Sequence, residues 1–180
     1  MINILLGVTG SIAAYKAAEL ANILNKTGAS VKVIMTRSAV EFITPLTFQT
    51  ITKHKVYTEL FETFAYEDVR HISLAQETNL LLIAPATANI IGKLACGIAD
   101  DMLTTVAMAV TAPKVICPAM NTTMYENAIT QGNIKKLEAV GYIFVEPRES
   151  LLACGDVGKG AMADIDAIIR KVNEVMAIIK

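Results

Sequence analysis

The sequence predicts an α/β protein built on a doubly wound parallel sheet. Short apolar runs rich in β-branched residues alternate with stretches of helical period along the 180 residues of the chain. The beginning shows this most clearly, because a strand is expected at 2–8, a helix at about 12–26 and a second strand at 31–35, with Gly28 as the helix stop. This pattern is the opening of a parallel βαβ unit, in which helices cover both faces of the sheet.

The rest of the chain repeats the alternation and shows no internal repeat or low-complexity segment. With 53% hydrophobic residues, it has enough apolar material for one core and too little length for two ordinary domains. We therefore expect a single Rossmann-like, flavodoxin-like domain over residues 1–180. Its further elements are expected as strands at 80–84, 114–117 and 142–145 and as helices at about 88–96, 102–110 and 128–140.

Two segments depart from this regular pattern. Residues 44–70 mix aromatic and charged side chains around Pro45, and we expect only a short helix and a connection there. Residues 148–163 hold three glycines and predict a long loop or flap, after which Asp164 caps a last amphipathic helix. Long loops in compact domains often carry function, so the flap is a candidate part of a site.

Composition and charge exclude several classes of partner. The formal net charge is −1 and the Lys and Arg residues are scattered, so nucleic acid is not expected as a ligand. The apolar runs are shorter than the roughly 20 residues that span a bilayer, and no leader is visible, so we expect a cytoplasmic protein without membrane contact. Three widely spaced cysteines fit neither a disulfide framework nor a zinc site, and no metal is expected.

Turns rich in glycine and hydroxyl groups follow the predicted strands, at the edge where open parallel sheets bind ligands. Gly10 and Ser11 open the first helix, where main-chain N–H groups and the helix dipole favour a phosphate. Thr36 and Ser38 follow the second strand in place of the acidic residue that holds a ribose, so a mononucleotide is favoured over NAD. Thr87 begins another helix among small residues. Each turn alone is about equally well explained as a structural helix cap.

The loop after the next strand contains an unusual asparagine and methionine pair. Asn121 could hold a carboxylate through its amide N–H groups without adding charge, or it could form an ordinary Asx turn. Met124 could line a site or simply fill the core.

One histidine and one cysteine are candidates for proton transfer. His71 stands near a predicted helix start, where a partly buried imidazole can exchange protons near neutral pH, although an ordinary hydrogen-bonded histidine is the alternative. Cys154 lies in the glycine-rich flap and is available for chemistry unless it is an incidental loop residue. Cys96 and Cys117, on an apolar helix and at a strand end, are expected to be inert core thiols.

Several segments carry a family resemblance when they are taken together. They read GSIAAYK at 10–16, HISL at 71–74, PATAN at 85–89, PAMNTTMY at 118–125 and ACGD at 153–156. In this order the chain resembles the homo-oligomeric flavin-containing cysteine decarboxylases over nearly its whole length, and within them the members that act on phosphopantothenoylcysteine. Tyr125 stands where the family motif often has Trp, which is a conservative change.

The resemblance implies FMN as the cofactor, bound between neighbouring subunits of a homotrimer that in some members assembles further into a dodecamer. It implies that His71 is the active-site base and that Cys154 is the proton donor on the flap. Asn121 would grip the substrate carboxylate, with Met124 and Ala153 beside the substrate. The residues implied for the flavin site are Gly10, Ser11, Thr36, Ser38, Thr87, Ala88, Asn89 and Ala119.

The same resemblance implies a carboxy-lyase of coenzyme A biosynthesis that converts phosphopantothenoylcysteine to phosphopantetheine. An alkyl carboxylate loses carbon dioxide readily only when the electron pair left on carbon has a sink. In the family, FMN takes a hydride equivalent from the carbon bearing the thiol, and the resulting thioaldehyde lets the pair delocalise onto sulfur as an enethiolate. By the same resemblance, the hydride would then return while Cys154 would supply a proton, so there would be no net redox change.

Related proteins leave alternatives open. A peptidyl-cysteine decarboxylase shares the histidine and the methionine–asparagine motifs, although the ACGD segment at 153–156 favours the smaller substrate. A non-catalytic FMN-binding regulatory subunit is a further alternative, although this chain has no acidic or low-complexity tail. In many bacteria and archaea a phosphopantothenate–cysteine ligase is fused to this domain, so such a ligase is expected as a fused or separate partner.

Overall fold

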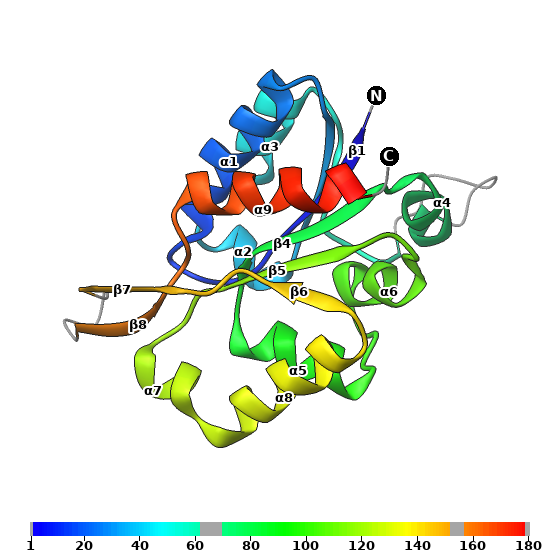
Figure 1. Cartoon of the computed structure of the whole chain (residues 1–180). Coiled ribbons are helices and arrows are strands. Elements are labelled where there is room, and N and C mark those ends of the chain that lie inside the picture. Colours follow the sequence, from blue (N-terminus) through cyan, green and yellow to red (C-terminus); the bar gives the residue numbers. More distant parts are fainter. Residues whose placement is uncertain (1, 62–69, 152–156, 179–180) are drawn as a thin grey trace.

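The central sheet holds six parallel strands with helices on both of its faces (Figure 1). The computed structural model describes residues 2–61, 70–151 and 157–178. The strands of the sheet are β1 (Asn3–Val8), β2 (Ser30–Met35), β3 (Val56–Tyr57), β4 (Leu80–Ala86), β5 (Lys114–Pro118) and β6 (Tyr142–Phe144). Their order across the sheet is β3-β2-β1-β4-β5-β6.

The strand order reverses between β1 and β4. From β1 the chain runs outward through β2 to β3, and it then returns to the other side of β1 to form β4, β5 and β6. This is the order of doubly wound Rossmann-like sheets, and without the two-residue edge strand β3 it is the flavodoxin-like order. The predicted fold class is confirmed. The reversal also marks the place where open sheets of this kind bind their ligands.

Each face of the sheet has its own apolar cluster and its own layer of helices. One face carries α1 (Ala14–Lys26), α3 (Pro45–Thr52) and α9 (Ile165–Ile178), and the other carries α4 (Arg70–Glu77), α5 (Ala88–Cys96), α6 (Met102–Ala109) and α8 (Ala128–Ala139). The short helices α2 (Arg37–Val40) and α7 (Thr122–Glu126) follow β2 and β5. Within the described residues, no helix combines the length and the apolar character needed to cross a membrane.

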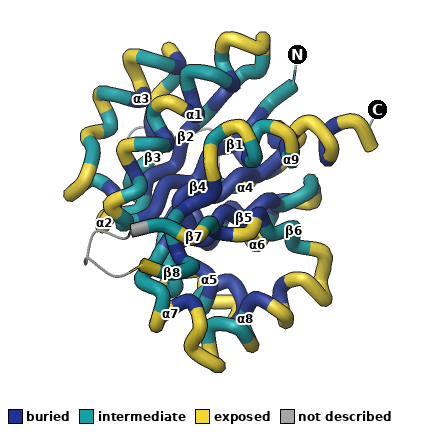
Figure 2. Tube along the Cα trace, turned by 60° about the vertical axis from the view of Figure 1, so that its left-hand side comes forward, coloured by how far each residue is buried: buried dark blue, intermediate teal, exposed yellow. Residues whose placement is uncertain are grey.

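Strand β4 shows why the strands read as unbroken apolar runs. All seven of its residues are buried (Figure 2), and successive side chains of a strand point to opposite faces of the sheet. Leu82 and Ala84 belong to the cluster beneath α1 and α9, whereas Leu81 and Ile83 belong to the cluster beneath α5 and α6. A strand that is covered on both faces has no polar side, so its sequence shows no alternation.

Local hydrogen bonds set the ends of the helices near the carboxyl edge. The Thr87 hydroxyl accepts the Ile90 N–H at 3.3 Å and caps α5, which ends at Gly97 with a φ of 68°. Asp101 and Thr104 form a capping box at the start of α6. The helices predicted in this part of the chain are confirmed.

The segment predicted as a long flap is largely a β-hairpin. Strands β7 (Arg148–Leu151) and β8 (Val157–Ala161) pair antiparallel as a separate two-stranded sheet. β8 reads VGKGA, which has no apolar alternation, so its strand conformation comes from pairing and packing rather than from local propensity. The prediction of a loop is therefore wrong for these two strands. Asp164 does precede the last helix, and its main-chain oxygen accepts hydrogen bonds from Ala167 and Ile168.

Two smaller predictions are also corrected by the structure. The segment 44–70 contains the expected short helix α3 but also the edge strand β3, which is too short to give a sequence period. Cys96 is exposed at the end of α5 rather than buried in the core. Cys117 in β5 is buried as predicted, and this burial raises the pKa of its thiol far above the ordinary value.

Candidate functional site

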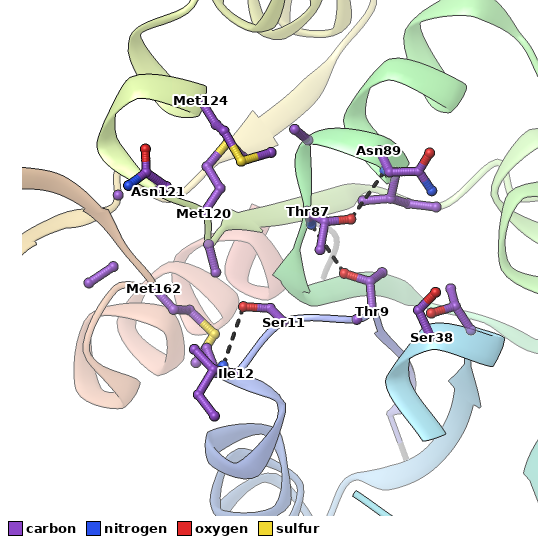
Figure 3. A pocket seen from close by; sticks show the side chains of 18 of the residues that line it. Thr9, Ser11, Ile12, Ser38, Thr87, Asn89, Met120, Asn121, Met124 and Met162 are labelled. Carbon is purple, nitrogen blue, oxygen red and sulfur yellow. Dashed lines mark hydrogen bonds between the residues drawn. The ribbon is translucent and has the colours of Figure 1, made fainter. Parts of the chain in front are cut away.

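A cavity of about 850 Å³ opens at the carboxyl edge of the sheet, beside the reversal between β1 and β4 (Figure 3). Its wall comes from the turns that follow β1, β2, β4 and β5 and from the β7–β8 hairpin. These turns are far apart in the sequence, and the parallel sheet places all of them at one edge. Ligand sites usually have volumes of about 300–1,000 Å³, so the cavity has the size of a cofactor or substrate site.

Every residue predicted for the flavin site lines this cavity, and so do Asn121 and Met124 from the predicted substrate site. The predicted flavin-site residues in the wall are Gly10, Ser11, Thr36, Ser38, Thr87, Ala88, Asn89 and Ala119. Ala153 and Cys154 lie outside the described residues.

Thr9 joins the two turns on either side of the strand reversal. Its hydroxyl donates to the Pro85 carbonyl at 2.7 Å and accepts the Thr87 N–H at 3.1 Å. The residue is only 2% exposed, so both hydrogen bonds are shielded from water. The sequence analysis missed Thr9. Its hydrogen-bond partners, Pro85 in β4 and Thr87 just after that strand, are more than seventy residues away in the sequence, and only the fold brings them together.

The turns after β1 and β2 are held against each other at Gly10. A Cβ placed on Gly10 would lie 2.4 Å from the Ser38 Cβ and 3.0 Å from the Ser38 carbonyl carbon. No side chain fits in that space without moving the second turn. Glycine at this position therefore brings the hydroxyl groups of two different turns to one end of the cavity.

This end of the cavity has the donors that a phosphate needs. The hydroxyl oxygens of Ser11, Thr36 and Thr87 each accept a main-chain N–H group, from Ala13, Ala39 and Ile90 respectively. A hydroxyl whose oxygen is used in this way still carries a proton that can be donated to an anion. The adjoining helix start of α1 adds the positive end of a helix dipole. This donor set fits the phosphate of a mononucleotide.

Sulfur-containing and amide side chains gather at the other end, which Figure 3 shows opposite Ser38 and Asn89. Met120 and Met124 line the wall there, and apolar, polarisable side chains of this kind suit a flat ring or a thiol substrate. Asn121 lies among them, and its Oδ1 accepts the Thr123 N–H at 2.8 Å as the cap of α7. Asn121 thus forms the Asx turn that was one of the two predicted alternatives, and it also lines the cavity.

Lys93 of α5 is one of the charged residues that line the cavity, and it is paired with two carboxylates. Its Nζ lies 2.7 Å from Asp100 Oδ1 and 3.2 Å from Asp101 Oδ2. The hydrogen bond between Lys93 and Asp100 raises the pKa of the amine and lowers the pKa of the carboxyl, so both remain charged near neutral pH and offset each other. Among the described residues, no group of three or more His, Cys, Asp or Glu side chains is placed to hold a metal ion.

His71 lies outside the cavity within a single chain. It is the second residue of α4 and is half-buried, which agrees with the predicted position near a helix start. Figure 1 shows α4 at the end of the molecule away from the β7–β8 hairpin. One chain by itself therefore does not bring His71 to Asn121.

Comparison with known proteins places the chain in a family. A model of the family described as Flavoprotein matches residues 1–177. This chain belongs to the flavoprotein family. The flavoprotein is 51% identical over 173 residues to the "probable phosphopantothenoylcysteine decarboxylase" of Streptococcus mutans serotype c, with 95% of this chain and 97% of that protein covered. It is also 51% identical over 168 residues to the "coenzyme A biosynthesis bifunctional protein CoaBC" of Bacillus subtilis, and the match covers 93% of this chain and 41% of that longer protein.

Solved structures share the fold of this flavoprotein along its length. A PPC decarboxylase mutant complexed with pantothenoylaminoethenethiol superposes with a TM-score of 0.88 and 32% identity over 98% of both chains. The FMN-dependent cysteine decarboxylase SpaF superposes with a TM-score of 0.85 and 30% identity, again over 98% of both chains.

Proposed function

We propose that this flavoprotein is a carboxy-lyase that uses FMN to decarboxylate phosphopantothenoylcysteine to phosphopantetheine, a step of coenzyme A biosynthesis. The observation that carries the proposal is the cavity at the strand reversal, where turns after four strands bring together the residues predicted for FMN and for the substrate carboxylate. The relatives from Streptococcus mutans and Bacillus subtilis are named for this activity and for coenzyme A biosynthesis, which supports the same substrate.

The residues of the cavity fit FMN at both of its ends. Ser11, Thr36 and Thr87 would hold the phosphate, and the small residues Ala88 and Ala119 would let a flat ring lie close to the main chain. Bound FMN would supply a reversible hydride acceptor, and oxidation of the carbon that bears the thiol would make the substrate sulfur the electron sink that decarboxylation requires. The chain itself would supply binding, orientation and proton transfer.

Asn121 would orient the substrate carboxylate. Because its Oδ1 accepts the Thr123 N–H, the amide plane is fixed and the Nδ2 group carries the donor hydrogens that a carboxylate requires. A neutral donor also suits the reaction, since the carboxylate leaves as uncharged carbon dioxide. A cationic side chain would stabilise the ground state more than the transition state and would slow the loss of carbon dioxide.

His71 would act as the base that deprotonates the substrate thiol, and this role needs a second subunit. In one chain the imidazole is outside the cavity, so a neighbouring copy would have to present its His71 to the cavity of the first. Ile12 and Tyr15 line the cavity edge and are 60% and 61% exposed, which provides apolar surface for such a contact. We include in the proposal a homotrimer with FMN at the subunit interface, with a dodecamer as a further assembly.

The remaining roles follow from the same proposal. Cys154 would donate the proton that completes the product, and Ala153 would contact the substrate beside it. The enzyme would work in the cytoplasm, where a phosphopantothenate–cysteine ligase, fused or separate, would provide its substrate.

The experiment that tests the proposed function compares two substrates. FMN-loaded protein is incubated with phosphopantothenoylcysteine or with a peptide that ends in cysteine, and the release of carbon dioxide is measured. We expect release from phosphopantothenoylcysteine and little from the peptide. Preference for the peptide would instead identify a peptidyl-cysteine decarboxylase, and bound FMN without release from either substrate would indicate a non-catalytic flavin-binding subunit.

A further inference from the structure

Strand β8 of the hairpin lies against the loop that carries Asn121. The main-chain N–H of Met120 donates to the Gly160 carbonyl at 3.0 Å, and β8 runs beside α7 (Figure 2). Asn121 and Gly160 both belong to the wall of the cavity. The hairpin is therefore bonded through its main chain to Met120, the residue directly before Asn121.

Gly160 is buried against the loop of Met120 and Asn121. A Cβ placed on Gly160 would lie 2.3 Å from the Met120 main-chain oxygen and 3.3 Å from the Asn121 carbonyl carbon. A carbon atom cannot approach a main-chain oxygen to that distance, so any other residue would push the loop and the strand apart. Glycine is thus needed for the observed separation.

Gly158 makes a similar contact with a side chain of the same loop. A Cβ there would lie 2.5 Å from Thr122 Oγ1 and 2.8 Å from Thr122 Cγ2. Gly158 and Gly160 are two residues apart in a strand, so they present the same side of β8. The Thr122 hydroxyl is buried and has no hydrogen-bond partner within the described part of the chain, so its contact with β8 is one of packing.

A polar contact next to the glycines fixes β8 to α7 as well. The Lys159 Nζ lies 2.5 Å from Glu146 Oε2 and 5.7 Å from the centre of the Tyr125 ring. The Tyr125 hydroxyl donates to the same Glu146 oxygen at 3.3 Å. Because Tyr125 lies four residues after Asn121 in the chain, this contact holds the same loop and helix from the other end.

We propose that Gly158 and Gly160, the glycine pair of β8, are positioning residues that set the place of Asn121 at the cavity. The functional consequence rests on the proposed function, since it takes Asn121 as the residue that orients the substrate carboxylate. The side of β8 that presents the two glycines has no side chain there, so the Asn121 loop can pack directly against the main chain of the hairpin. A displacement of about 1 Å at a residue that orients the reacting group can lower the rate about 100-fold.

Substitutions at Gly158 test the proposal, because a second substitution can relieve the clash. Gly158→Ala is compared with Gly132→Ala, an exposed position of α8 where an added Cβ meets nothing within 4 Å. The double variant Gly158→Ala/Thr122→Ala removes the two nearest atoms of Thr122 and leaves its Cβ at 3.1 Å. For each variant, the FMN content and the kcat and KM of carbon dioxide release from phosphopantothenoylcysteine are measured.

We expect Gly158→Ala to retain FMN while kcat/KM falls about 10-fold to 100-fold. The double variant should regain most of that loss, and Gly132→Ala should behave like the wild type. Gly158→Ala with wild-type kcat/KM, or a double variant as impaired as the single one, would overturn the proposal. If Gly158→Ala does not fold, a double variant that folds supports the contact, and one that also fails to fold contradicts it.

A structural measurement separates this inference from the proposed function. In a crystal structure of the FMN-loaded Gly158→Ala variant, we expect Asn121 to be displaced relative to the wild type, whereas an unmoved Asn121 would contradict the role of the glycine pair. A wild-type protein that releases no carbon dioxide from phosphopantothenoylcysteine would contradict the proposed function alone, because the displacement of Asn121 does not depend on activity.

Discussion

At the scale of single residues, the hydroxyl of Thr9 connects the two turns that face each other across the strand reversal. It is used as a donor to Pro85 and as an acceptor from Thr87, and both partners are main-chain groups. A buried main-chain N–H or C=O group that lacks a hydrogen bond costs more free energy than a typical hydrogen bond contributes to stability. The position of the Thr87 turn, and with it one side of the cavity, therefore depends on a residue that does not need to contact the ligand.

Replacing Thr9 by Val tests this connection. The substitution keeps the shape but removes the hydroxyl, so we expect the free energy of unfolding to fall by about 1–3 kcal/mol. Thr9→Ser keeps the hydroxyl and serves as the matched control, with a smaller loss. Denaturant unfolding of both variants measures the difference. Equal stability of the two variants would show that the hydroxyl does not hold the turns together.

At the scale of elements, the close approach of the turns after β1 and β2 shapes the phosphate end of the cavity. Gly10 permits this approach because no Cβ fits against Ser38. The turn after β1 leads into α1, whose first main-chain N–H groups and helix dipole favour an anion at this end of the cavity.

We expect Gly10→Ala to lose most of its FMN, since the added Cβ would push the Ser38 turn away from the phosphate end. The absorbance of the purified protein in the flavin range measures FMN content directly. Gly132→Ala, in open space on α8, controls for the general effect of a glycine substitution. Full FMN content in Gly10→Ala would exclude the turn after β1 as part of the flavin site.

The sequence allowed the strands and helices around the site to be predicted where their own side chains carry the pattern. β4 is buried on both faces and its sequence is an unbroken apolar run. The ends of α5 are indicated by the N-cap residue Thr87 and the C-cap residue Gly97. β8 could not be predicted, because Gly158 and Gly160 contribute nothing to a hydrophobic period. Glycine is required at these positions by the close packing against the Met120–Thr122 loop, which the sequence does not show.

The same distinction holds for the residues of the site. Gly10, Ser38 and Asn121 could be predicted because each follows a predicted strand at the edge where ligands bind. Thr9 could not, since its role depends on the distant residues Pro85 and Thr87, which only the folded sheet brings to it.

At the scale of the whole molecule, His71 lies apart from the cavity in a single chain, which is why the proposed function includes an assembly of subunits. The histidine is on α4, whereas the cavity lies beside the hairpin and the turns of the carboxyl edge. A site shared between neighbouring subunits would unite the base of one copy with the Asn121 of the next. A head-to-tail contact of this kind closes naturally into a ring, as in a trimer.

Co-expression of two variants, each inactive alone, tests whether the site is shared between subunits. His71→Asn and Asn121→Ala should each retain FMN and lose decarboxylation when expressed alone. In an even random mixture, about a quarter of the interfaces would pair an intact His71 with an intact Asn121, so co-expression should restore about a quarter of the wild-type activity. Mixed oligomers without any restored activity would indicate that both residues act within one subunit.

The most direct measurement of the central claim, that FMN at the carboxyl edge enables this chain to decarboxylate a cysteine-derived acid, is a cofactor titration. Protein freed of flavin is given increasing amounts of FMN, and carbon dioxide release from phosphopantothenoylcysteine is followed together with FMN binding. We predict no release without FMN and a rise that saturates at one FMN per chain. Release that is independent of FMN, or full FMN occupancy without release, would contradict the claim.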